Sequence, residues 1–191
     1  MVACRLKNAF DKYCSFPIEF WSSLSELGEI ISVDKEATLK KAYRVEKHIY
    51  FILKGSGGIL LWKKNNFVCT DLVLSEDFIC DYLSFLSRKE TAYEVRIFED
   101  SKLFKVSNAS LQILLNKSQL GDKFWRHALE ALYIDKHLQY IQSSIYTADE
   151  IYRLMVKHQP EIVQRIPQKY IASYLGITPQ SLSRIRRNFS N

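Results

Sequence analysis

The residues best suited to chemistry lie near the C-terminal end, in the segment RIPQKYIASYLGITPQSLSRIRRNF (Arg165–Phe189). No acidic residue follows Glu161, so positive charge is concentrated at this end of the chain. Arginine and glutamine side chains can hydrogen-bond to base edges and phosphates in a DNA groove. This composition predicts a polyanionic partner, in keeping with the formal net charge of +6.

The apolar spacing of this segment predicts two short helices joined by a tight turn. The first helix runs from about Gln168 to Tyr174 and ends at Gly176, which can adopt a positive φ. The second has Thr178 as its N-cap and Pro179 at its first helical position, and continues to about Phe189. Such a pair is typical of a helix-turn-helix. Its expected shared core consists of Ile171, Leu175, Ile177, Leu182 and Ile185, and Ala172 is small where the two crossing helices approach each other.

The outward face of the second helix carries polar and basic side chains and no acid, which suits a major groove. A helical hairpin with a merely solvated basic face is the alternative. The residues predicted to contact DNA are Lys169, Thr178, Pro179, Gln180, Ser181, Ser183, Arg184 and Arg187.

The remaining segments must position this helix pair. Apolar residues at helical spacing predict a helix over Ile18–Ile31. From about Thr38 to Val106 the pattern becomes short and strand-like, which favours an antiparallel sandwich or barrel over a parallel α/β sheet. The expected strands are His48–Leu53, Gly58–Trp62, Asn66–Val73, Ala92–Phe98 and Lys102–Val106.

Helical periodicity returns after Asn108, first in a short helix over Ser110–Leu115. The segment Asp122–Ser144 contains no Gly or Pro and predicts a helix about 35 Å long at ~1.5 Å per residue. Because a small domain needs a shorter helix, we expect this helix to pack on its own domain and on a partner chain. An ordinary core helix is the alternative, since the heptad is imperfect at Asp135 and Gln142. A further helix is expected over Ala148–His158.

Composition limits the other possibilities. The apolar fraction of 47% supports a packed core. Neither C-x-x-C spacing nor a histidine at zinc-finger distance accompanies the cysteines, so we expect reduced thiols, no metal and no cofactor. No signal-peptide core is present, and no apolar run approaches the ~18 residues of a membrane helix. We therefore predict a cytoplasmic protein without membrane contact. The cysteines are Cys4, Cys14, Cys69 and Cys80.

Together these features resemble the Crp/Fnr family of transcription regulators. The resemblance implies an α+β fold in which an N-terminal antiparallel, jelly-roll-like β-roll with flanking helices occupies residues 1–118. A long dimerisation helix would occupy residues 119–145, and a small helical helix-turn-helix domain residues 146–191. The segments that carry the resemblance are KHIYFILKGSGGILLW (Lys47–Trp62), SEDFICDYLSFL (Ser75–Leu86), YEVRIFEDSKLFKVS (Tyr93–Ser107) and, best of all, IPQKYIASYLGITPQSLSRIRRNF (Ile166–Phe189).

The resemblance also implies roles and partners. Gln180 and Arg184 fall where the family places base-reading residues, and Pro179 replaces the usual polar residue at a third reading position. Lys169, Arg186 and Arg187 are expected to hold phosphates. The implied partners are double-stranded DNA, a second copy of the chain and RNA polymerase. Because the chain stops at Asn191, just past the recognition helix, we expect fewer phosphate contacts than in longer relatives.

The implied effector pocket departs from that of cyclic-nucleotide binders. The family's glycine–acid pair appears as Cys80 and Asp81, and its phosphate-binding arginine as Glu90. A carboxylate repels a phosphodiester, and Arg88 or Lys89 would substitute only if the loop is shifted. We predict no response to cyclic AMP and leave the effector unidentified. The expected pocket residues are Phe78, Cys80, Asp81, Tyr82, Glu90, Thr91 and Ala92.

Two other classes of function compete with a regulator. An enzyme on the same roll, such as a cupin, would need clustered metal ligands, but only His48 lies among the strands, so we predict no enzymatic activity. A sensor or interaction module that has lost DNA binding is the second alternative. The predicted function is a sequence-specific DNA-binding regulator that acts as a homodimer and places two recognition helices in successive major grooves ~34 Å apart.

Overall fold

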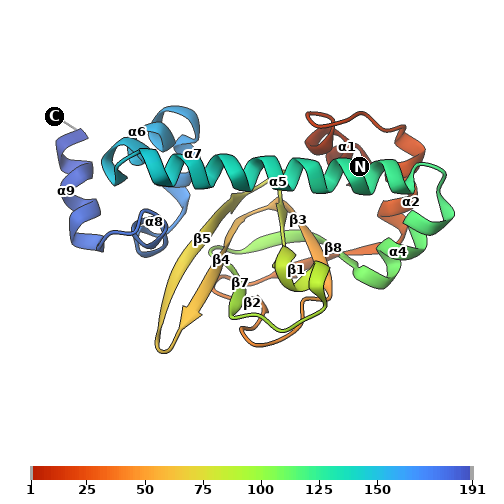
Figure 1. The fold of residues 1–191 in the computed structure, drawn as a ribbon, viewed down its shortest axis with the longest axis horizontal. Helices are drawn as coiled ribbons and strands as arrows, with labels where there is room; N and C mark the ends of the chain where they lie inside the picture. Colours follow the sequence, from red (N-terminus) through yellow and green to blue (C-terminus); the bar gives the residue numbers. More distant parts are fainter. Residues whose placement is uncertain (1, 190–191) are drawn as a thin grey trace.

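The computed structural model describes residues 2–189 as a β-roll, a long helix above it and a helical unit at one end (Figure 1). The helices are α1 (Val2–Phe10), α2 (Ile18–Glu26), α3 (Tyr82–Ser87), α4 (Asn108–Lys117), α5 (Gly121–Ile145), α6 (Ala148–His158), α7 (Pro160–Arg165), α8 (Gln168–Tyr174) and α9 (Pro179–Phe189). The strands are β1 (Gly28–Val33), β2 (Thr38–Lys40), β3 (His48–Lys54), β4 (Ser56–Lys63), β5 (Asn66–Leu74), β6 (Phe78–Ile79), β7 (Tyr93–Ile97) and β8 (Ser101–Ser107).

The roll consists of two four-stranded antiparallel sheets with strand orders β1-β8-β3-β6 and β2-β7-β4-β5. Apolar side chains from both sheets, including Ile52, Val95, Ile97 and Leu103, are buried in one cluster. Antiparallel strands alternate between a core-facing and an outer side chain, so the β-branched runs of the sequence supply this core. With the helices around it, the roll confirms the predicted α+β class.

Residues 27–31 differ from the prediction. The sequence predicts a helix through Ile31, but α2 ends at Glu26 and β1 begins at Gly28. The strand pairs with β8 from Gly28 opposite Val106 to Val33 opposite Ser101. Glycine weakens a helix, and the residues that follow gain a full ladder of hydrogen bonds in the sheet, so long-range pairing overrides the local helical spacing.

The long helix α5 passes over the roll, from the side of α1, α2 and α4 to the helical unit at the other end of the molecule (Figure 1). Its N-terminal half packs against α1, α2 and α4, where Phe124 lies 4.9 Å, centroid to centroid, from both Phe10 and Phe20. Trp21 completes this aromatic cluster and is fully buried. Ring burial of this kind fixes the helix firmly on the roll at this end.

The C-terminal unit consists of helices and short connections in its described residues, 146–189. Thr147 and Glu150 form a capping box at the start of α6, which sets the direction of the chain as it leaves α5. The unit packs on the roll through α8 and β5, and both contribute to one buried cluster in which Phe98 and Tyr170 stack at 4.0 Å. Residues 1, 190 and 191, including the chain end at Asn191, lie outside the described residues.

Candidate nucleic-acid interface and effector site

The turn between α8 and α9 has the geometry expected from the sequence. Gly176 adopts a φ of +68°, and its N–H donates to the Ser173 carbonyl at 3.1 Å. The Ile177 N–H donates to the Ala172 carbonyl at 3.0 Å, which closes the end of α8. Ala172 and Leu182 are fully buried between the two helices. A side chain larger than alanine would hold the crossing helices apart, so the small residue is part of the motif.

The start of α9 is capped as its sequence predicts. The Thr178 side chain accepts a hydrogen bond from the Ser181 N–H at 3.1 Å, and Pro179 occupies the first helical position. The remaining N–H groups at this end point out of the helix and carry the positive end of its dipole. An anionic phosphate would therefore be stabilised here.

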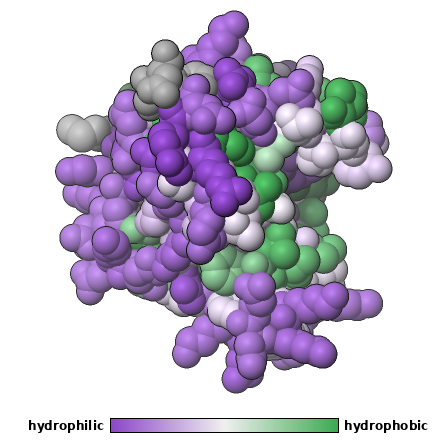
Figure 2. Space-filling view, turned by 90° about the vertical axis from the view of Figure 1, so that its left-hand side faces the viewer, coloured by the Kyte–Doolittle hydropathy of each residue, from purple (hydrophilic) through white to green (hydrophobic). Residues whose placement is uncertain are grey.

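The side chains predicted to contact DNA lie on the surface of α8 and α9. Gln180, Ser183, Arg184 and Arg187 are exposed on α9, and Ser181 is half-buried against Thr178. Figure 2 views the molecule from the end that carries α9 and shows a largely hydrophilic surface crossed by an apolar band. The structure thus brings the predicted reading residues together on one outward face.

Lys169 differs from the α9 residues because it also contacts the roll. Its ammonium lies 3.4 Å from the Glu36 carboxylate, and the Tyr170 hydroxyl donates to the same carboxylate at 2.8 Å. The interaction with Tyr170, with a smaller contribution from Glu36, raises the pKa of Lys169. Arg165, also in the basic segment, pairs with Glu99 and Glu161 at 2.7 Å each. Part of the C-terminal charge therefore attaches this unit to the roll.

The two halves of α5 differ in burial. Phe124 and Ala131 are buried, whereas Tyr133, Leu138 and Ile145 are 69%, 52% and 68% exposed. Ile134 and Ile141 are exposed on the same half of the helix. An apolar stretch of this size on an otherwise polar helix marks a surface that a partner would cover.

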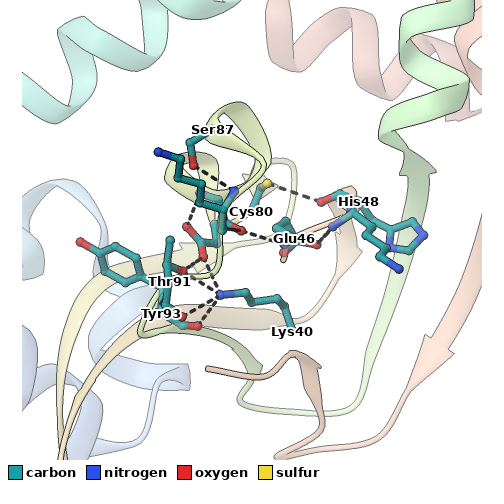
Figure 3. A network of polar contacts seen from close by, with 11 residues as sticks. Lys40, Glu46, His48, Cys80, Ser87, Thr91 and Tyr93 are labelled. Carbon is teal, nitrogen blue, oxygen red and sulfur yellow. Dashed lines mark hydrogen bonds and ion pairs between the residues drawn. The ribbon is translucent and has the colours of Figure 1, made fainter. Parts of the chain in front are cut away.

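A buried lysine organises the predicted effector region of the roll (Figure 3). The Lys40 ammonium donates to the Asp81 carboxylate at 2.7 Å, to the Thr91 hydroxyl at 2.8 Å and to the Tyr93 carbonyl at 2.7 Å. The Thr91 hydroxyl also donates to Asp81. The side chains of Lys40 and Asp81 are only 3% and 1% exposed. Every N–H of the ammonium has an acceptor, as a buried charge requires.

The network extends to α3 and to the start of β3. Asp81 caps α3 by accepting from the Ser84 N–H at 3.1 Å, and Ser84 Oγ accepts from the Glu46 N–H at 2.8 Å. Glu46 Oε1 accepts from the N–H groups of Lys47 and His48. Burial raises the pKa of the Glu46 carboxyl to about 7, although these N–H groups act in the opposite direction.

The predicted effector residues separate into several places. Cys80, Asp81 and Tyr82 line a cleft of about 560 Å³ between the roll and α5. Phe78 lines a different, mainly apolar cavity of about 140 Å³. Thr91 is held by Lys40, Glu90 is exposed, and the Ala92 carbonyl accepts from the Trp62 N–H at 3.0 Å. The structure therefore joins only part of the set in one cleft.

Lys40 is the residue that sequence reasoning missed. It lies in β2, a strand of three residues that the sequence pattern did not reveal. A single lysine in a short polar stretch gives no local signal of burial, because its acceptors come from residues 81, 91 and 93. Only the pairing of β2 with β7 places it beside them.

Two kinds of site are not found in the described part of the chain. Residues 2–189 hold no cluster of three histidine, cysteine or acidic side chains that could bind a metal ion. Within the same residues, no helix is both long enough and apolar enough to span a membrane. All four cysteines are unpaired thiols.

Comparison with known proteins gives a match in structure but none in sequence. No family model matches the chain, and no curated protein does. The structure of CLP, described as a c-di-GMP responsive global regulator of Xanthomonas campestris, matches with a TM-score of 0.70 and 13% identity over 91% of this chain and 92% of that one. FixK2 from Bradyrhizobium japonicum matches with a TM-score of 0.68 and 16% identity over 85% and 84%.

A shorter structure matches the sensor part. A cyclic nucleotide-binding domain from Methylobacillus flagellatus KT matches with a TM-score of 0.64 and 15% identity, over 73% of this chain and 81% of that one. At these identities the comparisons establish the fold. The chain folds as Crp/Fnr-type regulators do, with a cyclic nucleotide-binding-like roll, which confirms the resemblance in fold predicted from the sequence.

Proposed function

We propose that this chain is a sequence-specific DNA-binding transcription regulator that acts as a homodimer. The outward face of α9 carries the proposal, because it combines exposed Gln180, Arg184 and Arg187 with a capped N-terminus and contains no acidic side chain. Arg184 would pair with guanine and Gln180 with adenine in the major groove. Lys169, Arg186 and Arg187 would bind phosphates, and binding would weaken with salt. We propose no enzymatic activity.

The exposed half of α5 supports the homodimer. A second copy packed along Tyr133, Leu138 and Ile145 would remove their apolar surface from water. Two-fold symmetry would then present two copies of α9 to one side of a duplex, about one helical turn or ~34 Å apart. A near-palindromic operator follows from that symmetry. RNA polymerase is a further proposed partner.

The Lys40 network supports the absence of a response to cyclic AMP. Asp81 and Thr91, which would hold the ligand, are already engaged by Lys40. Glu90 places a carboxylate at the position of the phosphate-binding arginine, and Arg88 donates instead to Asn108. The buried cation here, Lys40, is already paired with Asp81, so binding an anion would require breaking that ion pair. A separate pocket lined by Lys41, Arg44 and Lys47 also includes Lys40 and Glu46.

The test is selection of duplexes from a random pool by the purified chain at two salt concentrations. We expect a two-fold symmetric site, and a loss of ~1–3 kcal/mol in binding it when Arg184 is replaced by alanine. Arg126→Ala is the matched control, because it removes the same side chain from an exposed position on α5. Sequence-blind binding that is indifferent to Arg184 would favour the alternative function, a sensor or interaction module without specific DNA binding. The docking of α8 on β5 is the observation that favours this alternative.

A further inference from the structure

The cleft of about 560 Å³ lies where three parts of the molecule meet. Its walls come from β5 and α3 of the roll, from the C-terminal half of α5, and from α6 and α8 of the helical unit. Sites for small molecules in proteins typically enclose 300–1,000 Å³, so the cleft has a suitable size.

The charged side chains of the cleft are internally neutralised. Asp81 is paired with Lys40 at 2.7 Å, and Lys136 forms an ion pair with Asp71. Burial raises the pKa of the Cys69 thiol to about 12 and that of Cys80 well above its ordinary value, so both thiols remain uncharged at neutral pH. A charged ligand would have to break the Lys40–Asp81 or the Lys136–Asp71 ion pair to gain an opposite charge, and burying its own charge would be costly.

The uncharged side chains define the complementary ligand. Four tyrosines line the cleft together with aliphatic side chains from the roll and α5, which suits a flat ring system. Thr70, Gln142 and Ser143 supply hydrogen-bonding groups among them. We propose that the cleft binds an uncharged small molecule that has a planar apolar ring system and one or two hydrogen-bonding groups. The tyrosines are Tyr82, Tyr93, Tyr140 and Tyr174.

The wall of the cleft links such a ligand to the DNA-binding unit. Gln139 of α5 donates to the Thr70 carbonyl at 2.9 Å and to the Tyr174 hydroxyl at 3.0 Å. The preceding residue of α8, Ser173, accepts from the Cys69 N–H at 2.9 Å. A ligand against Tyr174 therefore contacts the helix that precedes the recognition turn, and it would favour one pose of that helix over another. This effect on DNA rests on the proposed function, whereas the binding of the ligand does not.

The experiment uses three probes that share one ring system and differ in charge: 1-naphthol, 1-naphthyl phosphate and 1-naphthylmethylamine. Binding to the full chain is measured by equilibrium dialysis at neutral pH. We expect 1-naphthol to bind at least about tenfold more tightly than either charged probe, which corresponds to ~1.4 kcal/mol. Equal or tighter binding of the phosphate, or no detectable binding of 1-naphthol, would overturn the proposal.

Substitutions at two neighbouring serines test where 1-naphthol binds. Ser143 lines the cleft and Ser144 does not, although both hydroxyls donate to the Tyr140 carbonyl at 2.8 and 2.9 Å. Ser143→Trp should fill the cleft and weaken 1-naphthol about tenfold or more, while Ser144→Trp leaves it unchanged. Light scattering confirms that both variants keep the same assembly. If Ser143→Trp binds 1-naphthol normally, the cleft is not the site.

The last measurement separates this proposal from the proposed function. Affinity for the selected duplex is measured with and without saturating 1-naphthol. A change that disappears in Ser143→Trp supports coupling through α8. Binding of 1-naphthol by a chain that selects no duplex would overturn the proposed function and keep the ligand site. Duplex selection without 1-naphthol binding would overturn the ligand site and keep the proposed function.

Discussion

The interior of the roll and the far end of the helical unit use the same residue types in opposite ways. In the roll, the Lys40 ammonium and the Asp81 carboxylate are almost fully buried and hydrogen-bonded. On α9, Arg184 and Arg187 are exposed to solvent. A buried charge without its partner is costly, so the interior pair holds its surroundings in one arrangement. Exposed charges cost little to maintain and can release counterions when a polyanion binds.

Lys169 and Glu36 lie between these extremes. Their ion pair is partly exposed, with 54% and 37% of the two side chains accessible. Pairs of this kind typically contribute about 0–1 kcal/mol, so the contact can be exchanged for another. The comparison therefore predicts large effects on stability from the interior charges, moderate effects on DNA binding from α9, and a small effect from the pair between them.

The largest effect is expected for Lys40→Met, which removes the charge but keeps most of the side-chain volume. Asp81 then remains buried without its cation, and the free energy of unfolding should fall by ~3–5 kcal/mol. Urea denaturation at pH 7 measures the change. Lys41→Met is the matched control, because Lys41 is the exposed neighbour and its substitution should change stability by less than ~0.5 kcal/mol. Equal effects from the two variants would contradict the role given to the network.

The second prediction concerns the pH dependence of stability. Burial raises the pKa of Glu46 to about 7 in the folded chain, whereas the unfolded carboxyl titrates near 4.5. Folding therefore favours the protonated carboxyl. Its contribution to the free energy of unfolding is complete below pH 4.5 and declines as the pH rises to 7. The decline should amount to ~3 kcal/mol.

Glu46→Gln should remove this decline, because glutamine resembles the protonated acid in shape and charge. We expect the variant and the unchanged chain to be similarly stable at pH 5, and the variant to be more stable at pH 8. Denaturation of both chains across this range measures the difference between their free energies of unfolding. Groups other than Glu46 titrate alike in the two chains, so their contributions cancel in this difference. A difference that is constant with pH would show that Glu46 does not titrate as described.

A smaller effect is expected for Arg187→Ala, which should weaken binding to all duplexes alike. Arg187 is exposed on α9 and is assigned to phosphate, so its loss should lower the slope of log affinity against log salt by about 1. Fluorescence anisotropy with the selected duplex and a scrambled one measures both slopes. A selective loss on the selected duplex would instead place Arg187 on a base edge.

The smallest effect is expected for Glu36→Gln, which releases Lys169 while keeping an acceptor for the Tyr170 hydroxyl. DNA affinity should rise by ~0.2–1 kcal/mol, because Lys169 no longer has to leave the Glu36 carboxylate in order to bind a DNA phosphate. In a Lys169→Ala background the same substitution should have no effect on affinity. A gain that persists without Lys169 would mean that Glu36 acts through the docking of α8.

The parts of the structure that the sequence predicts well depend on neighbours along the chain. Gly176, Thr178 and Pro179 specify the turn and cap of the helix pair by their own backbone preferences. The five expected strands and α5 follow from periodicity over many residues. The helix predicted through Ile31 was wrong after Glu26, since β8 lies far away in the sequence and local spacing carries no information about it.

The composition of the effector region could not be predicted for the same reason. The sequence placed Phe78 in one pocket with Cys80 and Asp81, but Phe78 lines the smaller cavity and not the cleft, whereas Tyr82 borders both. Lys40 was absent from the prediction, although it holds Asp81 and Thr91. Which side chains meet inside a roll depends on the register of strands that are distant in sequence.

The sequence by itself thus determined the helix pair at residues 168–189, its basic outward face and the general α+β class. These features rest on backbone propensities, caps and periodic burial, which act over a few residues. Only the tertiary structure decided that Lys40 neutralises Asp81, that Glu36 contacts Lys169 and that Tyr174 closes the cleft beside α5. Burial and electrostatic pairing act through space, so they are determined only once the sheets and helices have packed.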